Sequence, residues 1–91
     1  MTARGALRVR VEGRVQGVGV RWHTRLEARA LGVSGWVENG EDGSVRAHLE
    51  GEERRVEALV EWMGRGPSGA QVERLEREDV EPTGDVGFVI R

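Results

Sequence analysis

A glycine-rich segment that ends in an arginine, Gly13 to Arg21 (GRVQGVGVR), is the part of the chain best suited to hold an anion. Glycine accepts the positive φ angles that let successive backbone N–H groups converge on one point. Arginine adds a planar fork of donors that matches two oxygens of a phosphate group. The segment is therefore a candidate phosphate-binding loop, although the same glycines would also suit a tight turn that binds nothing.

Comparison with other phosphate-binding loops narrows the chemistry of this segment. The nucleotide P-loop needs a lysine, which this chain lacks, and the dinucleotide fingerprint needs a glycine where Trp22 stands. Cysteine-dependent phosphatases use a loop of the same span, with a nucleophilic cysteine at the position of Val15 and an arginine at that of Arg21. The segment thus has the form of a phosphate cradle without a nucleophile of its own.

A second candidate for chemistry is Asn39, the only asparagine of the chain. Its amide oxygen can accept a hydrogen bond from a water molecule and so orient that water. All 14 basic residues are arginine, which indicates a GC-rich genome in which asparagine is rare, so its presence favours a chemical role. The pair Asn39-Gly40 is also a common hairpin signal, and a structural role for the asparagine stays open.

The elements around these candidates follow from the spacing of apolar residues. Residues 7–11 alternate apolar and basic side chains and predict a half-buried strand before the loop. Residues 21–31 predict a helix after the loop, which Gly32 would cap at its C-terminus. The core face of this helix is expected to carry three residues at four-residue spacing: Trp22, Leu26 and Ala30.

The rest of the chain adds a hairpin, a second helix and two weaker strands. Strands are predicted over residues 35–39 and 45–50, and a helix from about residue 52 until Gly66-Pro67 stops it. A strand over residues 70–79 has its apolar residues out of period, which indicates a bulge, and a last strand covers residues 86–90.

This order of elements, β-α-β-β-α-β with a short extra C-terminal strand, predicts a ferredoxin-like α/β sandwich. In that fold an antiparallel sheet is covered by two helices on one face. Residues 1–91 are expected to form a single domain, because the chain is long enough for one core and shows no linker. The fold alone does not define an activity, so the loop and Asn39 must indicate the function.

Composition excludes several classes of protein. The chain has no cysteine, no apolar run long enough to cross a membrane and no secretory signal pattern, so a cytoplasmic protein is expected. Its net charge of −2 has basic and acidic residues interleaved, unlike the basic stripe of a nucleic-acid-binding protein. His23 and His48 lack a second histidine at metal-ligand spacing, so no metal site is predicted.

Taken together, the two candidate segments resemble the acylphosphatase family. The first segment matches the family pattern G-R-V-Q-G-V-x-aromatic-R at residues 13–21, except at the aromatic position. The second matches G-aromatic-V-x-N at residues 35–39, followed by G-x-V at residues 43–45 and a further glycine, Gly51. The ending at residues 88–91 is also similar to that of the family, so the resemblance spans nearly the whole chain.

The resemblance implies roles for individual residues. The catalytic arginine of the family falls on Arg21 and its water-orienting asparagine on Asn39. The phosphate-binding positions fall on the backbone of six loop residues: Val15, Gln16, Gly17, Val18, Gly19 and Val20. Two residues depart from the pattern: Val20 stands where an aromatic side chain is usual, and Glu38 stands where a basic or neutral polar residue is usual.

The implied reaction is hydrolysis of small acyl phosphates by direct attack of water, without cofactor or metal. The leaving group is a carboxylate with a pKa near ~4, which departs without a general acid. Inorganic phosphate, the product, is expected to inhibit, and the protein is expected to be monomeric and to bind neither nucleic acid nor membrane. Two alternatives stay open: a non-enzymatic anion-binding or regulatory module of the same fold, and a phosphatase acting on ordinary monoesters.

Overall fold

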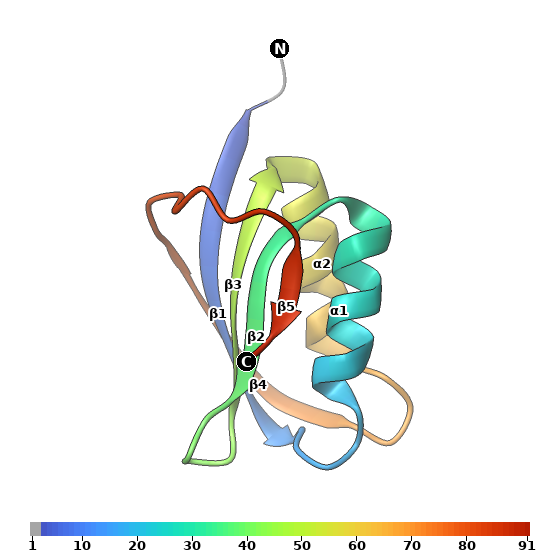
Figure 1. The fold of residues 1–91 in the computed structure, drawn as a ribbon. Coiled ribbons are helices and arrows are strands. Elements are labelled where there is room, and N and C mark those ends of the chain that lie inside the picture. The colour runs from blue at the N-terminus through green and yellow to red at the C-terminus, as the bar shows by residue number, and fades with distance from the viewer. Residues whose placement is uncertain (1–2) are drawn as a thin grey trace.

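A computed structural model that describes residues 3–91 shows a five-stranded sheet with two helices packed on one of its faces (Figure 1). The strand order is β4-β1-β3-β2-β5. The elements, in chain order, are β1 (Arg4–Arg14), α1 (Val20–Leu31), β2 (Ser34–Asn39), β3 (Val45–Glu52), α2 (Glu53–Arg65), β4 (Gln71–Asp79) and β5 (Phe88–Ile90). The predicted ferredoxin-like arrangement is confirmed, including the short additional strand.

Strand pairing agrees with the prediction except at one edge of the sheet. The pairs β1–β3, β1–β4 and β2–β3 are antiparallel, whereas β5 runs parallel to β2, so the sheet is mixed. The bulge predicted in the fourth strand is confirmed. Glu12 pairs with Arg74 and Gly13 with Val72, which leaves Glu73 as the extra residue on β4.

The predicted core face of α1 was wrong. Trp22 and Leu26 are 51% and 46% exposed and Ala30 is exposed as well. The buried residues of this helix are Val20, Thr24 and Ala28. These smaller side chains let the helix approach the sheet and α2 closely, whereas the prediction had weighted the larger apolar residues.

The ends of the two helices and the core agree with the sequence pattern. Gly32 adopts the left-handed conformation at the C-terminus of α1, and Gly66 ends α2. The buried face of α2 consists of the residues expected from helical periodicity: Val56, Leu59, Val60 and Met63. They pack with inward-facing residues of β1, β2 and β3 into one hydrophobic core.

The face of the sheet opposite the helices is partly covered by the chain itself. Residues 80–87 cross β1, β3 and β2 in turn before β5 begins (Figure 1). They bury His48 and Glu50, whose place on the polar side of β3 would otherwise leave them in water. Burial of these two polar residues was not expected from the alternating pattern, because the segment that covers them is remote in sequence.

Sheet topology brings the two candidate segments to the same end of the sheet, where β1 and β2 both finish. β1 and β2 are parallel to each other because each pairs antiparallel with β3, which lies between them. Val45 of β3 is the partner of both Val11 and Asn39, so these two residues stand at the same level of the sheet. The loop that follows β1 and the C-terminal end of β2 therefore lie side by side.

Candidate active site

A cleft of about 180 Å³ lies where the loop after β1, the start of α1 and the end of β2 meet. It is lined by eight residues: Val15, Gly17, Gly19, Val20, Arg21, Trp22, Asn39 and Ile90. The two residues singled out for chemistry, Arg21 and Asn39, are thus brought to one cleft from separate elements. A loop, an arginine and an amide that face the same space can bind an anion and orient a second small molecule beside it.

The loop has the backbone geometry that an anion site requires. Gly17 and Gly19 have φ angles of 76° and 81°, a region that other residues avoid. Gly19 caps α1, and the first helical hydrogen bond runs from the N–H of His23 to the Gly19 carbonyl. By helix geometry, the N–H groups of residues 20–22 then lack intrahelical acceptors. No side chain caps this helix and no acidic residue stands in its first turn, so its positive end stays available to an anion.

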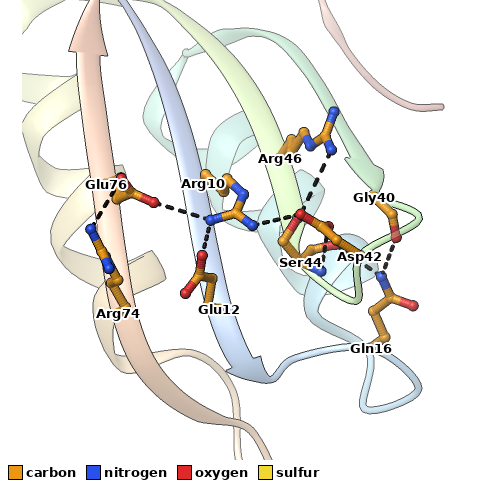
Figure 2. Close-up of polar contacts among 9 residues, drawn as sticks. All are labelled: Arg10, Glu12, Gln16, Gly40, Asp42, Ser44, Arg46, Arg74 and Glu76. Carbon is orange, nitrogen blue, oxygen red and sulfur yellow. Dashed lines mark hydrogen bonds and ion pairs between the residues drawn. The ribbon is translucent and has the colours of Figure 1, made fainter.

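The side chain of Gln16 joins the loop to the turn that follows Asn39. Its Nε2 donates to the carbonyl oxygens of Gly40, at 2.8 Å, and Ser44, at 2.9 Å (Figure 2). The two halves of the cleft are therefore fixed to each other by a side chain that does not itself line the cleft.

The turn between β2 and β3 is held from within and from the neighbouring strands (Figure 2). Asp42 accepts hydrogen bonds from the hydroxyl and the N–H of Ser44, and Arg10 of β1 donates to its other oxygen at 2.5 Å. The bonds from Ser44, followed by that from Arg10, hold the pKa of Asp42 well below its usual range. Arg10 also pairs with Glu12 and Glu76, which joins the turn to β1 and β4. Asn39 thus stands at the base of an ordered turn.

The structure separates the six predicted loop positions into two groups. Val15, Gly17, Gly19 and Val20 line the cleft, whereas Gln16 points to the turn and Val18 packs against the hydrophobic core.

The two departures from the family pattern have visible consequences. Val20 is 3% exposed, so it fills the position beside the loop as a core residue. Glu38 forms an ion pair with Arg91, with Nη1 and Oε1 3.8 Å apart. A carboxylate next to Asn39 would by itself repel an anionic ligand, and Arg91 offsets this negative charge.

Two residues that line the cleft were missed as site residues. Trp22 had been assigned to the core of α1, and Ile90 had been read only as part of a terminal strand. The sequence did contain a signal for Trp22, which is its position directly after Arg21. Nothing in the sequence indicated Ile90, because its place depends on the parallel pairing of β5 with β2.

One cluster among residues 3–91 carries atoms that metals favour: His48, Glu50 and Asp85. His48 Nδ1 accepts a hydrogen bond from Arg8, so its Nε2 carries the proton and donates to Glu50 at 2.5 Å. Two ligands of a tetrahedral zinc site lie roughly 3.3 Å apart, so this closer pair suits a hydrogen bond and not a shared metal.

The same Glu50 carboxylate is bound by the segment that crosses the sheet. Burial alone would raise its pKa, but hydrogen bonds from the Thr83 hydroxyl, from His48 and from the N–H groups of Thr83 and Gly84 lower the pKa to about 2. We call these four residues the Glu50 cluster. It anchors the segment that leads to β5, whose Ile90 lines the cleft.

Comparison with known proteins shows what this fold and cleft resemble. A family model described as Acylphosphatase matches residues 7–90. The protein named acylphosphatase from Thermococcus kodakarensis is 52% identical over 82 residues, 90% of each chain, and that from Pseudomonas paraeruginosa is 51% identical over 89 residues, 98% of each. A solved structure of an acylphosphatase from Coxiella burnetii has a TM-score of 0.93 at 33% identity, and the match covers 97% of this chain and 93% of that one.

The fold and the cleft define a small α+β protein with a glycine-rich loop beside an asparagine. The chain belongs to the acylphosphatase family, and its function is that of an acylphosphatase, a hydrolase of acid anhydrides. The family and the enzyme class predicted from the sequence are confirmed. Within residues 3–91, neither helix is long and apolar enough to cross a membrane.

Proposed function

We propose that this cleft hydrolyses acyl phosphates by direct, in-line attack of water on phosphorus. Arg21 and the loop amides hold the phosphoryl oxygens, and the side-chain oxygen of Asn39 accepts a hydrogen bond from the attacking water. The observation that carries the proposal is that Arg21 and Asn39, from different elements, line one cleft together with the glycine loop.

The reaction needs few catalytic side chains because its leaving group is a carboxylate. The water oxygen forms a bond to phosphorus while the bond from phosphorus to the acyl oxygen breaks, and the acyl group leaves as a carboxylate with the electron pair. A carboxylate of pKa ~4 leaves unprotonated, so no general acid is required. Asparagine is not a base, and the proton of the water passes to an oxygen of the phosphate. The protein positions the water and the phosphoryl group, and it stabilises the charge on the phosphoryl oxygens.

His23 is the nearest alternative nucleophile. A Cβ placed on Gly19 would lie 3.3 Å from its Cδ2, so the imidazole packs beside Gly19, the residue that caps α1. It does not line the cleft. Water remains the expected nucleophile, and no phosphoenzyme is expected to accumulate.

Three further properties are part of this proposal. Inorganic phosphate competes with substrate because it presents the same oxygens to Arg21 and the loop. The protein acts as a monomer, which light scattering would check. It needs no metal, because water attacks without a Lewis acid once Arg21 holds the phosphoryl charge.

The test is an assay of the purified protein with acetyl phosphate and benzoyl phosphate beside a simple alkyl phosphate, with and without chelator. We expect both acyl phosphates to be hydrolysed in the presence of chelator and the alkyl phosphate much more slowly, because an alkoxide leaving group needs an acid. Activity that disappears with chelator and returns with magnesium would overturn the mechanism. Phosphate binding without hydrolysis of either acyl phosphate would instead indicate an anion-binding module.

A further inference from the structure

The cleft has an apolar wall that the chemistry of phosphate does not explain. Trp22 lines it directly after Arg21, yet 51% of this residue is exposed. An indole is among the largest apolar groups of a protein, and leaving half of it in water forgoes the stabilisation that its burial would provide. A large aromatic surface kept open beside an anion site is suited to the rest of the ligand.

The indole is held in place from its own helix. The guanidinium of Arg25 lies over the Trp22 ring, with Cζ 4.4 Å from the ring centroid. This stack supports the ring from one side and lowers the cost of ordering it when a ligand binds.

Another part of the wall comes from β5, the strand that lies beside this face of α1. Arg29, seven residues after Trp22 and so on the same face of the helix, donates to the carbonyl of Phe88 at 3.3 Å. Toward the start of the helix, Ile90 lines the cleft together with Trp22 and packs on its inner side against the core. The two apolar side chains thus border the same opening from two elements.

We propose that Trp22 and Ile90 form the subsite for the acyl group of the substrate, and that this subsite favours apolar and above all aromatic acyl groups. The inference rests on the proposed function. With the phosphoryl group held by Arg21 and the loop, the acyl group extends from the phosphate into the remaining part of the cleft. There it meets an indole and an aliphatic side chain, which bind a phenyl ring more tightly than a methyl group.

The test compares benzoyl phosphate with acetyl phosphate in the wild-type protein and in Trp22→Ala. We expect the ratio of their kcat/KM values to fall about five- to tenfold in the variant, as loss of stacking and burial against one ring predicts. Trp22→Phe keeps an aromatic wall and should retain most of the preference. Leu26→Ala is the matched control, because Leu26 is a similarly exposed apolar residue on α1 that does not line the cleft, and its ratio should equal that of the wild type.

Inhibition by inorganic phosphate separates failure of this inference from failure of the proposed function. Phosphate lacks an acyl group, so its inhibition constant should change much less than the benzoyl-to-acetyl ratio in Trp22→Ala. An unchanged ratio with active enzyme would overturn the acyl subsite and leave the hydrolase intact. A ratio that falls equally in Leu26→Ala would show a general effect on α1 and would also overturn it. A wild-type protein that hydrolyses neither acyl phosphate would refute both proposals.

Discussion

Arg21 stands at a position that is unfavourable for the helix it begins. A cation in the first turn opposes the helix dipole by about 0.3–1 kcal/mol. Neither a side-chain cap nor an acidic residue in the first turn compensates for it in α1. An anion in the cleft would stabilise both Arg21 and the uncapped helix end, because both would then face negative charge.

Replacing Arg21 by lysine tests the need for a planar fork. We expect Arg21→Lys to lower kcat/KM by roughly 10²-fold or more, because a point charge cannot hold two phosphoryl oxygens at once. The fold should persist, as circular dichroism would show, since Arg21 lies at the cleft and not in the core. Near-normal activity of this variant would mean that Arg21 has another role.

We expect replacements of Arg21 and of Asn39 to differ in their effect on the inhibition constant of inorganic phosphate. Asn39→Ala should lower kcat by at least ~10²-fold and leave that constant nearly unchanged, because the side chain orients water. Arg21→Ala should weaken phosphate inhibition severely, because it removes a charge-assisted contact worth about 1.5–3 kcal/mol. Steady-state kinetics with phosphate as inhibitor measure both effects. Equal losses of affinity and rate in Asn39→Ala would assign that residue to binding.

At the scale of elements, we expect activity to depend on the distance between the loop after β1 and the turn after β2. Gln16 sets that distance through its two bonds to carbonyl oxygens, at 2.8 and 2.9 Å. Gly40, which accepts one of them, could carry a side chain only if those of Asp42 and Ser44 moved away. A Cβ there would lie 2.7 Å from oxygens of Asp42 and Ser44. The turn is therefore a compact platform that carries Asn39 toward the loop.

We expect Gln16→Ala to lower kcat about tenfold, since two neutral hydrogen bonds are lost and Asn39 is aimed less accurately. Gln16→Glu should be at least as damaging, because a carboxylate would face two carbonyl oxygens. Gln71→Ala, which removes an exposed glutamine from β4, is the control and should keep full activity. Unaltered kcat in Gln16→Ala would show that the strands alone hold the two halves of the cleft together.

At the scale of the whole molecule, the Glu50 cluster fastens the segment before β5 across the open face of the sheet. Its carboxylate has a pKa of about 2, below its ordinary value near 4.5. A carboxylate with a depressed pKa stabilises the folded state above the unfolded pKa, and this stabilisation is lost as the pH falls. The cluster should therefore act fully above pH 4.5 and weaken between pH 4.5 and 2.

Chemical denaturation at a series of pH values checks this contribution. Glu50→Gln should lower the free energy of unfolding by up to about 3 kcal/mol at pH 7, and the difference from wild type should shrink as the pH falls from 4.5 toward 2. Glu61→Gln, in an exposed pair with Arg65, should change stability little at any of these pH values. A difference for Glu50→Gln that stayed constant with pH would contradict the assigned titration.

Much of the fold could be predicted because its signals are local. Periodicity and glycine positions located both helix C-termini, the β2–β3 hairpin and the bulge near Glu73. The same local signals failed at α1, where apolar size favoured Trp22 and Leu26 while the buried face carries Thr24 and Ala28. Side-chain size does not determine which face of a helix is buried when close approach to a sheet requires small residues.

The sequence by itself determined the elements and their order, the family, and the two residues expected to carry the chemistry. The reason is that backbone conformation at glycines and the functional groups of Arg21 and Asn39 can be read directly from residue types. Only the tertiary structure decided that Trp22 and Ile90 border the cleft and that Glu50 is buried. The places of Ile90 and Glu50 depend on the segment before β5, which crosses the sheet and pairs β5 with β2, and that of Trp22 depends on which face of α1 packs on the sheet. Contacts between residues so remote in sequence leave no periodic pattern in it.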